Sequence, residues 1–575
     1  MAVLMHNLEL PGGPASATIS VEGPLAVSGP SRLAVTLAPN QQAVPVTTLK
    51  ATGAGRGVIR MDVSGPDNFR VQREVAITIR PARGAVTTIA GADLAPGAER
   101  RIAPAAERYI PGTWRAQASF GGAVRYDVPG LVQTLSEYPL RCLEQATSRG
   151  FPLALLPDSP LAGPDRATRL QDAVRLVLDR QRYDGAFALW SAGGEPQNWL
   201  SAYATEFLIR AKSAGAAVPE QALKDALKYL AEQADSAPGT AQDYADQAYR
   251  LYVLAYAGQG RPGAARVLAA DFNALPTPLA RAQIGAALAI ARDRPRAEAA
   301  FRAALDAPAR RFWYGDYGSA LRDQAAVALL LKESRLLPER LNQLTATLPG
   351  PDLVPTVLST QEQSWLIAAA AVLGRDGQPV RVALNGDPLP DGQTVSVALT
   401  GPAVARNLGE RPVWQALSVT GVPAQPLPAA RNQMVVRRYF HAMDGKPLNL
   451  DQLKQNTVFI LLLEMRAEDG QEHTAQLLHG LPAGWEIAGR FGAGKVPGLP
   501  WLGELSETDA QPAADDRFAA VLTLGTGSNF ARVAVKLRAV TPGNFELPGA
   551  ELSDMYRPGI FARQAAGRVN VLPVE

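Results

Sequence analysis

The spacing of apolar and polar positions changes twice along the chain. Up to about residue 128, apolar and polar side chains alternate, as in residues 16–21, 57–63 and 75–79, and clusters of Gly and Pro separate these stretches. An alternation with a period of two is typical of β-strands that bury one face. We therefore predict one β-sandwich that ends near residue 82, followed by a few strands of a second domain.

Between about residues 129 and 375 the apolar positions follow a helical period instead, and Ala and Leu are frequent. The segments with this period are 170–180, 199–214, 219–233, 244–257, 278–292 and 324–332. They are similar in length, and short loops containing Gly and Pro join them. This pattern predicts an array of helical pairs, either an open solenoid or a closed toroid.

Strand-like alternation returns at about residue 379. Residues 380–384 lead into Asn385-Gly386, a strong signal for a two-residue hairpin. Longer alternating stretches follow at 434–440, 458–465, 518–524 and 531–540. The order is therefore β, then α, then β. If the strands of 83–128 and 379–415 belong to one sheet, the helical region is inserted into a β-domain.

The composition argues against several classes of protein. The 51 Gly and 46 Pro among 575 residues favour many turns and short strands over one helical body. A net charge of +3, without a clustered Lys/Arg stripe, argues against a nucleic-acid partner. A single cysteine excludes an intrachain disulfide framework. The sequence contains no apolar run long enough to span a bilayer, and its start lacks a secretory signal.

The one cysteine, Cys142, is followed three residues later by Gln145. Residues i and i+3 at the start of a helix point to one face and can touch. A cysteine sulfur in contact with a glutamine carboxamide could be acylated by it, with loss of ammonia. The product would be an internal thioester, an electrophile stored in the protein. A thiol with a pKa of about 8.5 leaves far more readily than an amide nitrogen, so such a bond is suited to acyl transfer.

The residues around this pair resemble the thioester region of bacterial alpha-2-macroglobulins. Residues 138–149 read Tyr-Pro-Leu-Arg-Cys-Leu-Glu-Gln-Ala-Thr-Ser-Arg, and the family's motif is Tyr-Pro-x-x-Cys-x-Glu-Gln-x-x-Ser. Further stretches resemble the family's helical thioester domain and C-terminal domain. They are residues 182–190, 199–207, 317–324, 360–365, 499–505 and 554–558.

The resemblance implies a multidomain α+β architecture that matches the β-α-β order. It implies five segments. They are a macroglobulin-like β-sandwich at 1–82, the first part of a CUB-type β-domain at 83–128, an inserted α/α toroid thioester domain at 129–375, the second CUB part at 376–420, and a C-terminal macroglobulin-like β-sandwich at 421–575. Residues 3–7 look like a strand in mid-domain, so we expect the first sandwich to be truncated at its start. The family's upstream domains and bait segment would then be missing from a fragment.

The resemblance also implies a function. The family is a group of broad-spectrum endopeptidase inhibitors, in which a lysine amine of the attacking protease opens the thioester and tethers the protease. Each molecule reacts once, so we expect no enzyme and no cofactor. The full-length family is periplasmic and anchored to the inner membrane as a lipoprotein. Its implied partners are target proteases and a cell-wall synthesis protein such as a penicillin-binding protein, and the implied state is a monomer.

Histidine placement bears on which nucleophile reacts. The four histidines are His6, His441, His473 and His479, and none of them lies in the helical region. In the complement relatives, a histidine of the thioester domain assists transfer to hydroxyl groups. Without such a residue, transfer should favour amines over hydroxyls and water, because amines are strong nucleophiles without a general base.

A stored thioester has to be kept from water, and three residues are candidates for its cover. Tyr138, which Pro139 holds extended, can lay its ring over the bond, although ordinary packing is an equal alternative. Met555 and Tyr556 resemble the family element that covers the thioester from the other side, although Met555 could also be a gap-filling core residue.

Four further residues could line the site. Glu144 could steer the Gln145 carboxamide or simply cap the start of the helix. The aromatic set Trp313, Tyr314 and Tyr317 falls where the family's site wall would be, and toroid packing is the alternative interpretation.

Rival functions lack residues that they need. Asp184-Gly185 in a helical array is similar to terpene cyclase repeats, but no Asp-x-Asp-Asp cluster is present. One cysteine and no histidine in the helical region cannot build the zinc site of prenyltransferases, so we expect no zinc and no other metal. A cysteine hydrolase would need a histidine partner from a distant β-domain. The remaining alternative is an adhesion or opsonin-like module that uses the same thioester to couple to surfaces.

Overall fold

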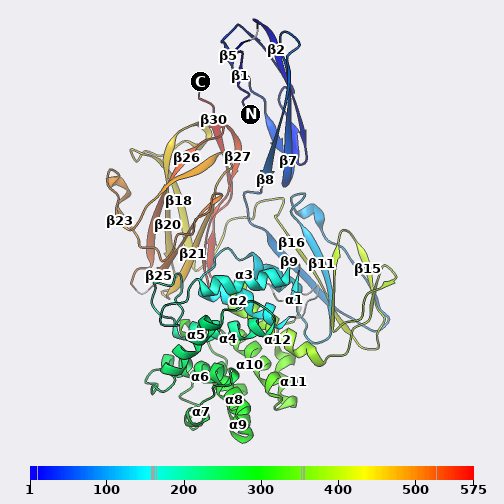
Figure 1. Ribbon diagram of the computed structural model, residues 1–575, viewed down its shortest axis with the longest axis vertical. Helices are drawn as coiled ribbons and strands as arrows, with labels where there is room; N and C mark the ends of the chain where they lie inside the picture. Colours follow the sequence, from blue (N-terminus) through cyan, green and yellow to red (C-terminus); the bar gives the residue numbers. More distant parts are fainter. Residues whose placement is uncertain are drawn as a thin grey trace.

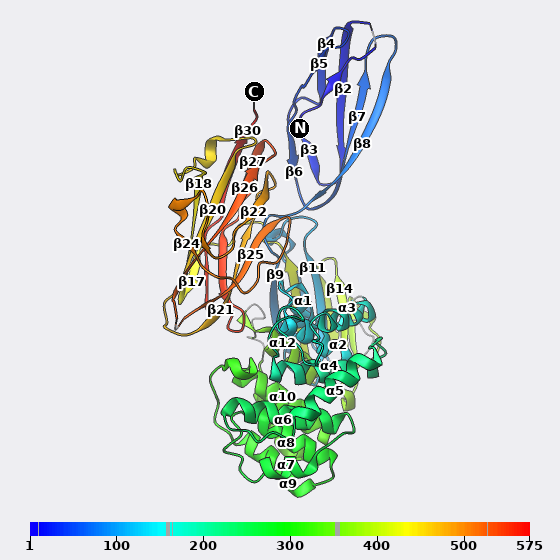
Figure 2. The ribbon, with the colours of Figure 1, turned by 60° about the vertical axis from the view of Figure 1, so that its left-hand side comes forward.

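The computed structural model has the β-α-β order and the mixed α and β class predicted from the sequence, both of which are confirmed (Figure 1). The structure describes residues 1–574 except 10, 157–161, 164, 351–352, 354–356 and 526. Figures 1 and 2 show the helical block at one end of the molecule and the first β-domain at the other. The last β-domain lies beside them, with its lower end against the helices.

The first β-domain contains a four-stranded antiparallel sheet in the order β4-β2-β7-β8 and two smaller pairs, β1-β5 and β3-β6. Its strands are β1 (Met5–His6), β2 (Gly13–Glu22), β3 (Leu25–Val27), β4 (Arg32–Leu37), β5 (Gln42–Ala43), β6 (Leu49–Ala51), β7 (Gly55–Ser64) and β8 (Arg70–Ile79). Alternate residues such as Ala17, Ile19 and Ile59 are buried in the core of this domain. The strands predicted from alternation lie within β2, β7 and β8.

The second β-domain is built from both sides of the helical block. Its sheets have the orders β14-β11-β16-β9 and β10-β15-β12-β13. The strands are β9 (Val86–Leu94), β10 (Glu99–Ile102), β11 (Arg115–Gly121), β12 (Val382–Leu384), β13 (Asp387–Pro388), β14 (Thr394–Leu399), β15 (Ala403–Asn407) and β16 (Val413–Gly421). Ala118 of β11 lies opposite Val397 on one side and Leu417 on the other. The helical block is therefore inserted into one β-domain, as the order of elements suggested.

The hairpin predicted at Asn385-Gly386 is present between β12 and β13. Leu384 pairs with Asp387, so the loop has two residues. Both loop residues have positive φ, 53° for Asn385 and 92° for Gly386. Asn and Gly tolerate this left-handed conformation better than other residues, which explains why the dipeptide marks such turns.

The helical block is a closed ring. Helices α2, α4, α6, α8, α10 and α12 each pack against the next, and α12 packs back onto α2. This selects the closed toroid over the open solenoid. The helices are α1 (Val128–Glu137), α2 (Leu143–Leu155), α3 (Arg166–Leu178), α4 (Asn198–Ser213), α5 (Glu220–Gln233), α6 (Ala241–Tyr256), α7 (Pro262–Leu268), α8 (Pro278–Ile290), α9 (Arg294–Leu305), α10 (Ala320–Ser334), α11 (Pro338–Thr347) and α12 (Thr360–Leu373).

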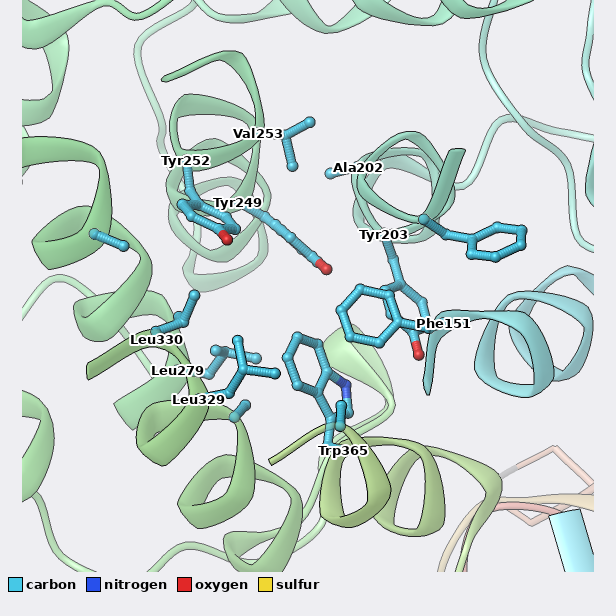
Figure 3. Packing of buried hydrophobic residues seen from close by; sticks show 14 of the residues in the cluster. Phe151, Ala202, Tyr203, Tyr249, Tyr252, Val253, Leu279, Leu329, Leu330 and Trp365 are labelled. Atoms are coloured by element: carbon cyan, nitrogen blue, oxygen red, sulfur yellow. The ribbon is translucent and has the colours of Figure 1, made fainter. Parts of the chain in front are cut away.

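The inner helices of the ring are buried nearly all round, whereas the outer helices have one apolar stripe. In α12 almost every residue is buried, but in α5 the buried residues are Ala226, Tyr229 and Leu230. A helix that is apolar on all sides has to lie inside a core. Figure 3 shows Tyr203, Tyr249 and Trp365 pointing from different inner helices into the centre of the ring. The centre is therefore a packed aromatic and aliphatic core.

The last β-domain is a sandwich whose main sheets are β17-β29-β28-β21-β25 and β18-β20-β26-β22. Its strands are β17 (Ala430–Asn432), β18 (Met434–Ala442), β19 (Leu453–Lys454), β20 (Val458–Ala467), β21 (His473–Gly480), β22 (Trp485–Arg490), β23 (Gly494–Lys495), β24 (Glu504–Leu505), β25 (Arg517–Leu524), β26 (Phe530–Ala539), β27 (Gly543–Leu547), β28 (Ala550–Asp554), β29 (Phe561–Arg563) and β30 (Gly567–Leu572). Facing residues such as Leu461 and Leu477 fill the core. The four longer strands predicted here are confirmed as β18, β20, β25 and β26.

Candidate functional site

Cys142 lies at the N-terminus of α2, after a short non-helical segment that separates α2 from α1. Helix α1 ends before Tyr138, whose extended backbone (φ −55°, ψ 128°) is the conformation favoured before Pro139. Cys142 is the N-cap of α2, with φ −66° and ψ 177°. Tyr138, four residues before the cysteine, is thus placed outside both helices.

Hydrogen bonds hold this turn against the segment that follows α3. The backbone N–H of Leu143 donates to the carbonyl of Leu189 at 2.8 Å. The guanidinium group of Arg180 donates to the carbonyl of Arg141. The cysteine is therefore presented by a backbone that is fixed on both sides.

Cys142 and Gln145 form a capping box. The Cys142 N–H donates to Oε1 of Gln145 at 2.8 Å, and the Gln145 N–H faces the Cys142 sulfur. Ser or Thr usually occupies the first position of this motif, with Glu or Gln three residues later. The box holds the carboxamide and the sulfur on one side of the first turn, as the i, i+3 spacing predicted.

One atom of this box is left without a partner. Both side chains have no exposed surface. The carboxamide nitrogen Nε2 of Gln145 is buried and has no hydrogen-bond partner among the residues that the structure describes. A buried donor that is left unpaired costs about 1–3 kcal/mol. Nε2 is also the atom that would leave as ammonia if a thioester formed.

The surroundings keep the sulfur uncharged. Burial, followed by the neighbouring Glu144 carboxylate, raises the pKa of the Cys142 thiol to about 12. A thiolate is therefore strongly disfavoured while the site is closed. This separates Cys142 from the nucleophilic cysteines of enzymes, whose pKa is lowered.

Glu144 points into the helical block. Its carboxylate accepts hydrogen bonds from Ser148 at 2.6 Å and from Thr360 at 2.7 Å, so it ties α2 to α12. Burial raises the pKa of this carboxyl group, while the bonds from Ser148 and Thr360 lower it. The side chain therefore links two inner helices.

The predicted covering residues gather in one apolar cluster at the junction with the last β-domain. This cover cluster consists of Tyr138, Leu140, Trp190, Ala510, Phe312, Tyr314, Tyr317, Val521, Met555 and Tyr556. It brings together Tyr138 from before α2, Tyr314 and Tyr317 from the loop before α10, and Met555 and Tyr556 from the loop after β28. Trp313 lies elsewhere and packs against the helical core.

Tyr556 is at the centre of the cover cluster. Its ring centroid lies 5.0 Å from that of Tyr317, 6.0 Å from Tyr314 and 6.2 Å from Phe312. Burial, and after it the charge that Cys142 would carry, raises the pKa of the Tyr556 hydroxyl well above its usual value. The Tyr556 ring thus lies in an apolar layer contributed by both domains.

Sequence reasoning missed the charged cluster that supports this layer. Arg310 bonds to Asp316 and to Asp323, both at 2.7 Å, and Arg322 bonds to the same two carboxylates at 2.5 and 2.9 Å. The four groups are largely buried and fix the loop that carries Phe312, Tyr314 and Tyr317. Arg322-Asp323 within an otherwise Ala- and Leu-rich helix was the available signal.

Predictions from the sequence also concerned histidines, metal sites and membrane spans. His473, in β21, hydrogen-bonds to Asp554 at 2.9 Å and to Asp469 at 2.8 Å rather than to the thioester pair. Within the described part of the chain, no group of three or more His, Cys, Asp or Glu residues could hold a metal ion. The same part contains no helix long and apolar enough to cross a bilayer.

Comparison with known proteins adds independent findings. Residues 434–559 match the family model "Bacterial Alpha-2-macroglobulin MG10 domain". The chain is 30% identical over 95% of its length to the alpha-2-macroglobulin of Escherichia coli, and 28% identical over 81% of its length to that of Xylella fastidiosa. It covers 36% and 31% of these relatives, so it spans about a third of their length.

Solved structures agree with this over the whole chain. The fold matches the native Escherichia coli alpha-2-macroglobulin structure that spans domain MG7 to the C-terminus, with a TM-score of 0.84 and 27% identity. The match covers 100% of this chain and 96% of that one. A Salmonella alpha-2-macroglobulin reacted with methylamine matches with a TM-score of 0.81 and 27% identity, over 100% of this chain and 40% of that one.

Proposed function

Because this chain is a homologue of the C-terminal part of bacterial alpha-2-macroglobulins, we propose that it carries an internal thioester between Cys142 and Gln145. We further propose that the protein uses this bond to trap proteases covalently. The observation that carries the proposal is the buried capping box, in which the sulfur and the carboxamide share one turn and the carboxamide nitrogen has no partner among the described residues.

Formation of the bond exchanges an amide for a thioester. The sulfur of Cys142 attacks the side-chain carbonyl carbon of Gln145, the carbon–nitrogen bond breaks, and the nitrogen leaves as ammonia with the thiol proton. Oxygen Oε1 stays in place and can keep its bond from the Cys142 N–H, which lies 2.8 Å away. The step removes the unpaired donor and the ionisable thiol together, so two unfavourable features of the buried pair disappear.

Transfer reverses the roles of the groups. An incoming lysine amine attacks the same carbon, a carbon–nitrogen bond forms, and the carbon–sulfur bond breaks. The amine proton passes to the departing sulfur, which leaves a free Cys142 thiol and an isopeptide to the protease. Each molecule reacts once, which fits an inhibitor rather than an enzyme; the homologues are alpha-2-macroglobulins.

Burial makes the closed site slow to react. The leaving sulfur would have to form a thiolate in an environment that raises the pKa of the thiol to about 12. The cover cluster also separates the bond from water, and excluding water prevents hydrolysis of reactive groups. Opening the cluster would admit the amine and make the thiolate a better leaving group in the same movement.

The wider setting is proposed on homology. The described strands support a macroglobulin-like sandwich, a CUB-type β-domain split by the helical ring, and a C-terminal macroglobulin-like domain. For the whole protein we propose a periplasmic, membrane-anchored monomer that meets proteases and a cell-wall synthesis protein such as a penicillin-binding protein.

The mass of the peptide that contains Cys142 and Gln145 tests the bond. The proposal expects the intact protein to be lighter by one ammonia, and methylamine to release one thiol and leave a methylamide on Gln145. Cys142→Ser is the matched control and should show neither change. A parent protein with its full mass and a freely titrating thiol would contradict the proposal.

A second measurement distinguishes a protease trap from a surface adhesin. The full-length protein is mixed with a protease, and cross-linked peptides are identified by mass spectrometry. An isopeptide between Gln145 and a protease lysine supports the trap. Coupling to surface glycans or amines, without coupling to the protease, would favour the adhesin instead.

A further inference from the structure

One hydroxyl group of the helical block lies within hydrogen-bond distance of four groups of the last β-domain, two of which share its single proton as acceptors. The oxygen of Tyr314 lies 3.0 Å from the carbonyl of Glu472 and 3.2 Å from the carboxylate of Asp554. It also accepts from the N–H of Thr474 at 3.0 Å and from the guanidinium group of Arg557 at 3.1 Å. A hydroxyl has one proton to donate and two lone pairs to accept, so this oxygen is fully used.

Asp554 connects that hydroxyl to the Met555-Tyr556 loop, which belongs to the cover cluster. Its Oδ1 accepts from the N–H groups of Tyr556 and Arg557, at 2.8 and 2.9 Å. Its Oδ2 accepts from the Arg557 side chain at 2.9 Å and from Tyr314. The carboxylate has no exposed surface. The conformation of the Met555-Tyr556 loop therefore depends on Asp554, which also contacts Tyr314.

Tyr314 itself is held by a loop that cannot easily move. The Arg–Asp pairs described above join Arg310, before Tyr314, and Asp316, after it, to each other and to α10. Tyr317, the next aromatic residue of the loop, has a φ of 53°, a left-handed conformation that is uncommon for a bulky side chain. A Cβ on Gly318 would lie 1.8 Å from Arg322, so this close approach requires glycine. The Tyr314 side therefore acts as a fixed point.

We propose that the Tyr314 hydroxyl and the Asp554 carboxylate form a latch that holds the last β-domain over the thioester pair. Both are positioning residues: neither touches the reacting atoms, and each acts through the Met555-Tyr556 loop. The inference rests on the proposed thioester, and it adds the contact that has to break before an amine can enter. The cover cluster supplies apolar contact, whereas the latch supplies directional bonds.

His473 makes the latch sensitive to pH. It faces Asp554, Asp469 and Arg557, with the hydroxyl of Tyr314 close by. Burial lowers the pKa of His473, but the bonds to Asp554 and Asp469 outweigh this and raise it above its ordinary value. A histidine whose folded pKa is raised stabilises the fold below its unfolded pKa of about 6.5, and this stabilisation is lost as the pH rises through the folded pKa. The latch should therefore weaken with rising pH.

The first test removes one oxygen atom. Tyr314→Phe keeps the ring in the cover cluster but deletes the hydroxyl and every hydrogen bond that it makes, and we expect methylamine to release the thiol about tenfold faster or more. Tyr183→Phe is the matched control, because Tyr183 is on the helical block and 95% exposed; it should react at the parental rate. Asp554→Asn should accelerate release as well. Parental rates in both latch variants, with the thioester formed, would overturn the proposal.

The second test uses pH. A merely structural histidine would change reactivity by the same factor at every pH. His473→Gln should instead react faster than the parent below the pKa of His473, and the ratio of the two rates should fall toward one as the pH rises. Protonation of methylamine affects both proteins equally and cancels in the ratio. A ratio that does not vary with pH would contradict the role of His473.

Hydrogen exchange distinguishes failure of the latch from failure of the thioester. Tyr314→Phe should lower the protection of peptides covering residues 472–476 and 554–558, whether or not the bond has formed. If the parent protein lacks the ammonia deficit, the proposed function fails and exchange alone decides the latch. Unchanged protection in the variant would reject the latch even if the thioester is present.

Discussion

Three helices of the inner ring, α2, α6 and α12, begin with a capping box, and the boxes of α2 and α12 differ in their chemistry. At α12, Ser359 accepts from the N–H of Glu362 at 3.1 Å, and Glu362 accepts from the N–H of Ser359 at 2.8 Å. The second carboxylate oxygen of Glu362 accepts from Ser319 at 2.5 Å. Both carboxylate oxygens of Glu362 have a partner, and the box begins α12 and ties it to the start of α10.

At α2 the backbone geometry is that of the same motif, but the side chains are Cys142 and Gln145. Sulfur replaces a hydroxyl oxygen, and a carboxamide replaces a carboxylate, so the box has a good leaving group and a nitrogen that can be lost. On the proposed thioester, two side-chain differences and one missing hydrogen-bond partner are what distinguish a reactive site from a common helix start. The backbone needs no special design.

Converting the α2 box to the ordinary kind has the largest expected effect. Cys142→Ser should abolish thiol release because no sulfur remains, and it should abolish the ammonia deficit because a serine hydroxyl is a much weaker nucleophile towards the Gln145 carboxamide. The helix start should remain, since Ser is a preferred N-cap. Methylamine labelling measures the chemistry and circular dichroism the fold. Loss of helix in this variant would mean that the two boxes are not structurally equivalent.

The free thiol of an uncoupled α2 box should be nearly inert. In Gln145→Ala no thioester can form, and a thiol with a pKa of about 12 is deprotonated far less at pH 8 than an ordinary cysteine. We expect alkylation by iodoacetamide at least about a hundredfold slower than for a free cysteine, because the thiolate is the nucleophile. The rate should rise with pH up to 10 without levelling. A plateau near pH 8.5 would refute the shielded environment.

Removing Glu144 tests whether α2 is tied to α12 as the geometry indicates. Glu144→Ala leaves the hydroxyl groups of Ser148 and Thr360 without their buried acceptor, and we expect a loss of about 2–4 kcal/mol from the free energy of unfolding of the helical block. Glu220→Ala, at an exposed position, is the control and should change it by about 0.5 kcal/mol or less. Equal losses measured by thermal unfolding would contradict the tie.

The box of α12 should show the smallest effect. Ser359→Ala removes an N-cap and should lower the free energy of unfolding by about 1 kcal/mol, with Ser359→Thr restoring most of it. Thiol release by methylamine should stay at the parental rate, because this box contains no reactive pair. A change in thiol release would show that the two helix starts are coupled.

The sequence predicts the individual helices, strands and turns well, but it predicts poorly which of them pack or pair with one another. Period and turn chemistry are local, so β2, β7, α4 and the Asn385-Gly386 hairpin could be predicted from neighbouring residues. The pairing of β11 with β14 and β16 joins positions nearly 280 residues apart or more, and only the order of elements suggested it.

The candidate site divides in the same way. Cys142 and Gln145 follow from one turn of helix, whereas Phe312 and Asp554 meet the site only in three dimensions. Trp313 shows that sequence reasoning can place a loop at the site and still assign one of its side chains to the wrong side. Its backbone is extended (φ −138°, ψ 127°), and successive side chains of an extended chain point to opposite sides. Trp313 therefore packs into the helical core while its neighbours Phe312 and Tyr314 join the cover cluster.

The closure of the helical ring depends on helices that are synthesised at different times. The bond from Thr360 to Glu144 spans 216 residues, so the start of α2 leaves the ribosome long before α12 exists to pack against it. At about 5–20 residues per second, this interval lasts roughly 10–40 s. During it Cys142 and Gln145 are exposed to water and to every cellular amine, but the glutamine is still an amide, which is unreactive. On the proposed thioester, a pair that became electrophilic only after burial would be translated safely, because α12 and then the Met555-Tyr556 loop are made after it.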